Sequence, residues 1–305
     1  MTRTGSGRGF AFAALTLAGL FWGLGFPLGK LALREVEPAH LVLWRFAVAS
    51  AAALPFVLGA EARALFRSPP VLLSGVLYGL AFMVQFEGLA GVTVTLAALL
   101  VGAMPALVAV AARLLGERVS GTSWIGVIGA TVGAALIAGK PGGGGTPWGI
   151  ALSLASLVIF LGWLLVLKRA PVTRSALAVP AVTLVVAMLT ILPIALALHG
   201  VPPVRLSAAA WGGILGQGLL STFVATAAWQ YGAARVDSAS AGVFINIEPL
   251  IGAALGIGLF GDPAGLPLIL GGILIVAGSI VVVRGERPGS GSTHAADASR
   301  GLSSD

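Results

Sequence analysis

The 305-residue sequence has no cysteine and few charged residues. Without cysteine, the chain can form no disulfide, thiolate metal site or cysteine nucleophile. Charged residues make up 10% of the sequence, against about 25% in an ordinary globular protein. This is too little charge to cover the surface of a water-soluble chain of this length.

Residues for catalysis are also scarce. The three histidines, His40, His199 and His294, lie in expected loops or in the C-terminal tail, and no HExxH motif occurs. Only one carboxylate, that of Glu248, is expected near mid-membrane, so a catalytic pair is missing. The sequence also lacks a P-loop. We therefore expect neither an enzyme nor an ATP-driven pump, and we expect no cofactor and no metal ion.

Apolar residues are abundant instead. They make up 57% of the chain, and the mean hydropathy is +1.01. This composition predicts a polytopic membrane protein whose solvent is lipid. The net charge of +7 comes from Lys and Arg scattered over short loops, so no nucleic-acid partner is expected. The expected partners are the lipid bilayer and a small-molecule substrate, and the protein is expected to be a monomer or a homodimer.

Ten apolar segments are separated by charges, prolines or glycines, and each is close to the roughly 20 residues that cross a bilayer. They run approximately over 10–30, 40–58, 71–89, 93–114, 122–139, 147–167, 176–198, 208–231, 238–260 and 265–284. The predicted fold class is an all-α membrane protein with ten transmembrane helices. Residues 1–9 form an N-terminal tail in this reading, and residues 286–305, rich in Gly, Ser and Ala, form a disordered tail.

The distribution of Lys and Arg predicts the orientation. With the N-terminus inside, 13 of these residues fall on the cytoplasmic side and four, Lys30, Arg34, Lys140 and Arg205, fall outside. Arg45 lies within the second segment. Because positive residues favour the cytoplasmic side, both termini are expected in the cytoplasm.

The chain also repeats itself, with five segments in 10–140 and five in 146–285. At an offset of 144 residues, one face of the fourth segment matches one face of the ninth. The matching sets are Ala98, Gly102, Pro105, Ala109 and Ala112, and Gly242, Asn246, Pro249, Ala253 and Gly256. An odd number of spans inverts the second half, which gives the 5+5 inverted repeat common among secondary transporters. Small residues that merely allow close helix packing are the alternative.

Pro105 and Pro249 fall near the middle of their segments. Each proline removes a backbone donor and frees the carbonyl of Val101 or Ile245. A free carbonyl at midplane needs a partner, so the paired prolines favour a hinge or a polar cavity over a tolerated kink.

Several local patterns accompany this repeat. They are Phe21-Trp22-Gly23 with Lys30, Arg45-Phe46, and the segment ends Gly116-Glu117 and Gly261-Asp262. Together they resemble the drug/metabolite transporter superfamily in its EamA-type ten-helix branch, from which Asp262 departs mildly because such repeats usually end in Glu. The resemblance implies a small-molecule exporter of the cytoplasmic (inner) membrane that works by alternating access. Amino acids, aromatic or otherwise apolar, are the expected substrates, with lipophilic drugs or nucleobases as the alternative and an intramembrane enzyme as a distant one.

Polar and aromatic residues at midplane are the candidate substrate-binding residues. They are Trp22, Tyr78, Gln85, Trp163, Ser221, Asn246 and Glu248. A charged residue inside the membrane is costly, so Glu248 is the clearest candidate, although a protonated structural acid is equally open. Lone membrane aromatics most often pack. Arg45 is expected to play a structural part by snorkelling or pairing with a helix end.

Overall fold

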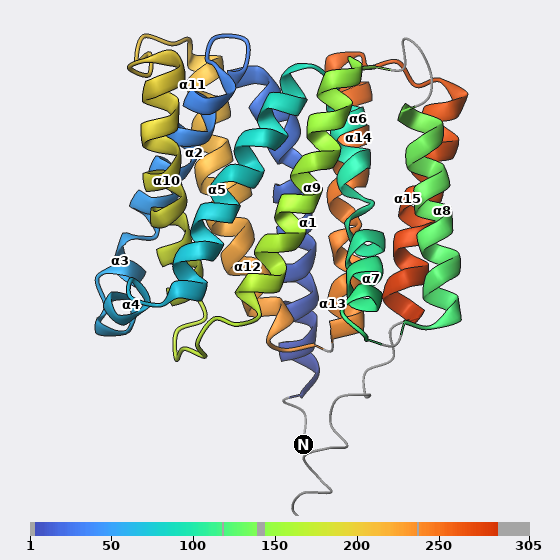
Figure 1. Ribbon diagram of the computed structural model, residues 1–305, viewed down its shortest axis with the longest axis horizontal. Coiled ribbons are helices and arrows are strands. Elements are labelled where there is room, and N and C mark those ends of the chain that lie inside the picture. The colour runs from blue at the N-terminus through green and yellow to red at the C-terminus, as the bar shows by residue number, and fades with distance from the viewer. Residues whose placement is uncertain (1–3, 118, 139–143, 237, 286–305) are drawn as a thin grey trace, which may run out of the picture.

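The computed structural model describes residues 4–117, 119–138, 144–236 and 238–285 (Figure 1). These residues form helices and connecting loops, with one isolated bridge between Val92 and Gly145. The first helix begins at Thr4, so it includes part of the expected N-terminal tail. The expected disordered tail, residues 286–305, lies outside the described residues. The prediction of an all-helical membrane protein is confirmed for the part of the chain that is described.

The helices follow the order of the predicted segments. They are α1 (Thr4–Ala32), α2 (Pro38–Ala52), α3 (Leu54–Val57), α4 (Ala60–Leu65), α5 (Pro69–Ala90), α6 (Val94–Val101), α7 (Met104–Leu114), α8 (Gly121–Ala138), α9 (Pro147–Leu167), α10 (Ala178–His199), α11 (Ala208–Gly216), the π-helix η1 (Gln217–Val224), α12 (Ala225–Ala233), α13 (Ser238–Ile245), α14 (Ile247–Phe260) and α15 (Leu266–Gly285).

Eight stretches among the described residues are long and apolar enough to cross a membrane. Two of the ten predicted segments are shorter than expected. The apolar stretch of α8 is Gly121–Ile137, and α2 has 15 residues. The second segment is short because Pro55 cannot continue a helix, so α2 ends at Ala52 and the turn of α3 follows.

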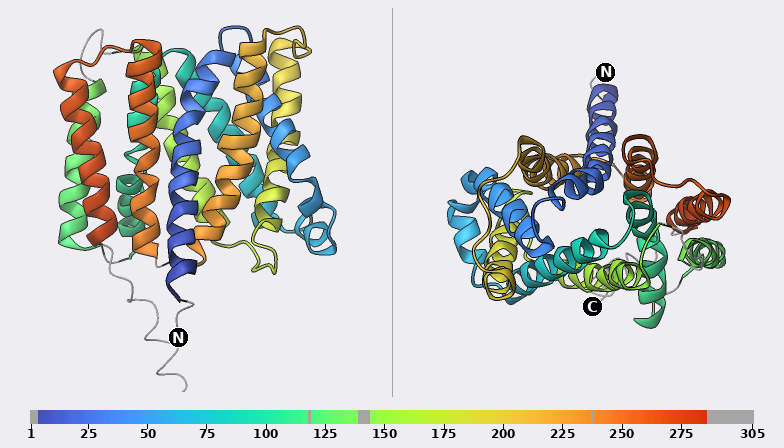
Figure 2. Two further views of the ribbon diagram at one scale, coloured as in Figure 1. Left: turned by 180° about the vertical axis from the view of Figure 1, so that it is seen from behind. Right: turned by 90° about the horizontal axis from the view of Figure 1, so that it is seen from above.

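The spans stand side by side in one bundle (Figure 1). We call the end where α1 begins the near end, and the end where α1 stops at Ala32 the far end. The pair α8 and α15 lies at one edge of the bundle, remote from α10 (Figure 2). Glycines let these two backbones touch, since a Cβ on Gly278 would lie 2.7 Å from the Ala130 amide nitrogen. The close approach makes α8 and α15 a tightly packed pair.

Two of the predicted segments break near their middles, and a third changes helix type there. The predicted fourth segment breaks between α6 and α7, at Gly102–Ala103, and the predicted ninth segment breaks between α13 and α14, at Asn246. Pro105 and Pro249 fall in the first turn of the helix after each break, where a proline is tolerated because no intrahelical donor is lost. The predicted eighth segment continues through η1, whose wider turns let Thr222 donate to the Gln217 carbonyl at 2.8 Å.

Candidate functional site

An aromatic cluster occupies the contact between α5 and α9. The Tyr78 and Trp163 rings lie 4.8 Å apart at an interplanar angle of 34°. Phe82 meets Tyr78 edge to face at 4.9 Å and Phe160 at 5.0 Å. Phe46 of α2 completes the cluster at 5.7 Å from Tyr78. Such pairs stabilise by about 0.5–1.5 kcal/mol beyond their burial and hold the rings in fixed orientations. The structure therefore brings Tyr78 and Trp163 together, as one rigid surface.

Arg45 enters this cluster from α2. Its side chain is buried, with 3% of its surface exposed, so the expectation that it snorkels is wrong. The guanidinium carbon lies 3.8 Å from the centre of the Phe82 ring, and Nε donates to Thr222 Oγ1 at 2.7 Å. The ring face and the hydroxyl replace part of the lost hydration, because an aromatic face attracts a cation.

Glu248 lies on the inward side of α14. The neighbouring position Leu250 is 52% exposed and Ile257 is 39% exposed, so these residues mark the outer side of the helix. Glu248 shares the opposite side with Gly252, which is buried against Ala98 of α6. The Glu248 side chain is half-buried, and its carboxylate interacts electrostatically with the Arg45 guanidinium.

The remaining candidates make other contacts. The Trp22 ring lies 5.3 Å from the ring of Trp229 of α12, at an interplanar angle of 45°. Ser221 is buried where η1 crosses α1 beside Gly25. Gln85 is buried on α5. Asn246 is buried and donates to the Val243 carbonyl of its own helix at 3.3 Å. For Asn246 and Ser221 the geometry is that of helix contacts, whereas Tyr78, Trp163 and Glu248 share one neighbourhood.

The far end is held closed by hydrogen bonds. Lys30 Nζ donates to the Leu89 and Val92 carbonyls, each at 2.7 Å, where α5 ends. Asp262 Oδ2 accepts from the amide and the hydroxyl of Thr95 at the start of α6, both at 2.8 Å. A cation at a helix C-terminus and an anion at a helix N-terminus are both favourable, so these contacts tie together α1, α5, α6 and the loop after α14.

A second far-end contact joins the loop after α1 to the start of α11. The Glu35 carboxylate accepts from the side chain of Ser207 and from its backbone amide, the latter at 2.8 Å. The hydrogen bond from the Ser207 side chain, followed by that from its amide, lowers the pKa of the Glu35 carboxyl below its ordinary value.

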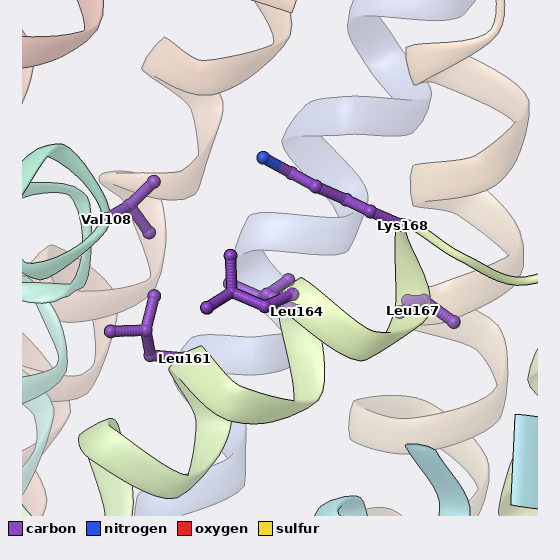
Figure 3. A pocket seen from close by; sticks show the side chains of 6 residues that line it. Val108, Leu161, Leu164, Leu167 and Lys168 are labelled. Carbon is purple, nitrogen blue, oxygen red and sulfur yellow. The ribbon is translucent and has the colours of Figure 1, made fainter. Parts of the chain in front are cut away.

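The near end contains a cavity of about 390 Å³ between α7 and α9. Its walls are apolar, and Lys168 lies at its rim (Figure 3). The Lys168 side chain extends over Leu164 and points toward the side of α7 that carries Val108 (Figure 3). Lys168 is exposed, and no hydrogen-bond acceptor for its ammonium is found among the described residues. The two ends therefore differ at equivalent lysines, because Lys30 is hydrogen-bonded at the far end whereas Lys168 borders an open apolar pocket at the near end.

Sequence reasoning missed three parts of this region. Phe82 and Phe160 look like ordinary apolar residues, and the sequence does not show that the Arg45 side chain turns inward. The near-end cavity depends on how far α7 and α9 stand apart, which no sequence pattern reports. The sequence did contain a signal for Arg45, because an arginine within an apolar membrane segment is costly and often marks a functional site.

Comparison with known proteins identifies the family. Residues 9–139 and again residues 147–284 match the family described as "EamA-like transporter family". The chain belongs to the EamA-like transporter family. An uncharacterized transporter of Archaeoglobus fulgidus is 26% identical over 279 residues, which cover 88% of this chain and 97% of that protein. YdzE, a permease-like protein of Bacillus subtilis, is 33% identical over 67 residues, which cover 22% of this chain and 86% of that protein.

One crystal structure also shares the fold of this EamA-like chain. It superposes with a TM-score of 0.61 at 21% identity, covering 98% of this chain and 99% of that one. The resemblance to the drug/metabolite transporters is thus confirmed. The protein is a multi-pass membrane transporter and not an enzyme.

Proposed function

We propose that this EamA-like protein exports small metabolites, with amino acids as the favoured substrates, across the cytoplasmic membrane by alternating access. The observation that carries the proposal is the buried Arg45, which interacts electrostatically with Glu248 and packs on Phe82 beside the Tyr78–Trp163 ring pair. Apolar walls with a few polar groups are typical of a small-molecule site. An ammonium suits the Glu248 carboxylate, whereas a purely apolar compound would leave it unpaired at a cost of about 1–3 kcal/mol.

The proposed architecture is ten spans arranged as two inverted repeats, 10–140 and 146–285, with both termini in the cytoplasm. Orientation can be measured directly, because the chain has no cysteine of its own. Val201 at the far end is 84% exposed, and Val172 at the near end is fully exposed. A Val201→Cys variant should react with an impermeant maleimide from outside the cell, and Val172→Cys only after the cells are opened. The reverse pattern would overturn the orientation.

Alternating access gives a reason for the difference between the two ends. Lys30 and Lys168 close equivalent segments, and Asp262 and Glu117 follow equivalent glycines. In this conformation Lys30 and Asp262 latch the far end, while Lys168 and Glu117 are exposed at the near end. In the opposite conformation, Lys168 and Glu117 close the near end in the same way. Lys168 then binds the carbonyls that end α12, and Glu117 binds the amides that begin α13.

A second candidate, export of lipophilic compounds, is favoured by the apolar walls of the near-end cavity. Those walls are formed by Val108, Leu161, Leu164, Leu165 and Leu167. Proteoliposomes loaded with unlabelled amino acids, nucleobases or lipophilic cations separate the two candidates. Amino-acid export predicts saturable counterflow of labelled phenylalanine or leucine. Counterflow with lipophilic cations alone would support the second candidate, and flux that never saturates would indicate a channel.

A further inference from the structure

Arg45 is an unusual charge for the interior of a membrane protein. It is buried on α2, yet it makes no ion pair with any carboxylate among the described residues. Of its five N–H groups, only Nε has an acceptor there, the neutral hydroxyl of Thr222. The Thr222 hydroxyl donates a hydrogen bond to the Gln217 carbonyl, so its oxygen can accept one from Arg45. A buried charge without an opposite charge in contact is costly and is retained where it serves a function.

The guanidinium is held in one orientation. The Phe82 ring supports one face at 3.8 Å, and Phe86 lies at 5.5 Å from the same carbon. With Nε fixed by Thr222, the end of the group that carries the two terminal nitrogens remains available. That end presents parallel donors whose spacing matches a carboxylate, and such paired charged bonds are strong and directional.

Glu248 supplies the complementary charge at a distance. It interacts electrostatically with Arg45 but forms no ion pair with it in the described part of the chain. An acid and an arginine that served only to neutralise each other would be expected in contact. A positive and a negative group that are held apart instead match the two ends of a zwitterion.

We propose that Arg45 binds the substrate carboxylate, so that the transporter selects zwitterions which carry both a carboxylate and an ammonium. This inference rests on the proposed function and deepens it. Glu248 takes the ammonium, and the Tyr78–Trp163 ring pair receives the apolar side chain. Trp163 Nε1 is buried without a hydrogen-bond partner among the described residues, so the indole has a donor left for a polar substituent. Amides, esters and decarboxylated amines are poor ligands for such a site.

The test uses purified full-length protein and three ligands: phenylalanine, phenylalaninamide and 2-phenylethylamine. Wild type should bind phenylalanine about 10- to 100-fold more tightly than either analogue, the ratio expected for a lost pair of charged hydrogen bonds. Arg45→Gln should weaken phenylalanine binding by that factor and leave the analogues within about 2-fold. Arg45→Lys keeps the charge but loses the paired donors, so its discrimination should be intermediate.

Arg34→Gln is the matched control, because Arg34 is exposed at the far end and lies 5.7 Å from the Phe260 ring. It should retain wild-type discrimination. If Arg45→Gln weakens all three ligands equally, Arg45 is structural and the inference fails. If Arg45→Gln does not fold, the test is the ratio of the wild-type affinities for phenylalanine and for phenylalaninamide. Equal affinities for the two ligands overturn the inference. If wild type shows amino-acid counterflow but either of these binding results is found, the inference about Arg45 fails and the proposed function stands. If wild type shows no amino-acid counterflow, the proposed function itself is rejected.

Discussion

Removing the Asp262 carboxylate should open the far end. One of its oxygens accepts two hydrogen bonds from Thr95, both at 2.8 Å, and Thr95 is fully buried. Hydrogen bonds to a charged group contribute about 1.5–3 kcal/mol each. Asp262 is half-buried, so solvent weakens both bonds, and we take about 2 kcal/mol for the pair. If the bonds form only in the closed state, Asp262→Ala raises the far-end-open population about 30-fold.

The rate of cysteine alkylation reports this population. Leu89 is fully buried beneath Lys30 in the closed far end, so a Leu89→Cys reporter should react only when that end opens. Asp262→Ala should raise its reaction rate with an impermeant maleimide roughly 10- to 50-fold, and Asp262→Asn should raise it less because one neutral acceptor remains. Glu37→Ala, at an exposed acid of the same end, is the control. Equal rates in Asp262→Ala and Glu37→Ala would refute the latch.

Three further predictions concern the near end, the glycine contact and the broken spans. Lys168→Met should slow counterflow several-fold while ligand affinity stays within about 2-fold, because the state with the near end closed loses the hydrogen bonds of the Lys168 ammonium. Gly278→Ala should lower the apparent melting temperature, since overpacking costs about 1–3 kcal/mol and outweighs the helix propensity gained, which is about 1 kcal/mol. Pro105→Ala and Pro249→Ala should each slow exchange more than they weaken binding, because alanine lets one helix continue through the break and so stiffens it.

Each of these has a matched comparison. Arg169→Met, beside Lys168, should exchange at the wild-type rate, and equal slowing by both variants would contradict a gating task for Lys168. Gly129→Ala should be neutral or stabilising, since the nearest atoms to its Cβ lie 3.8 Å away. An unchanged melting temperature in Gly278→Ala would contradict the close α8–α15 contact. Unchanged turnover in both proline variants would mean that the breaks do not move.

The fold class could be predicted because its causes are local. Apolar segments of the right length predict the spans, and the two prolines mark the spans that break. The limits of the sequence appear at α2, where Pro55 ends the helix early, and at η1, whose extra width has no clear sequence pattern.

The candidate site was harder to predict because it depends on how each helix is rotated. Tyr78 and Trp163 meet since α5 and α9 pack against each other, which residue depth alone does not reveal. Asn246, at a similar depth, bonds to its own helix instead. Arg45 shows the same limit, because the direction of a long side chain is decided by Phe82 and Thr222 on other helices.

Photolabelling would locate the bound substrate. A labelled phenylalanine that carries a diazirine on its ring would be bound to wild-type protein and irradiated, and the modified peptides would be mapped. We expect labelling of α5 and α9 around Tyr78 and Trp163, which excess phenylalanine removes and which Glu248→Gln weakens. Labelling confined to Val108 and residues 164–168, at the near-end cavity, would contradict this location.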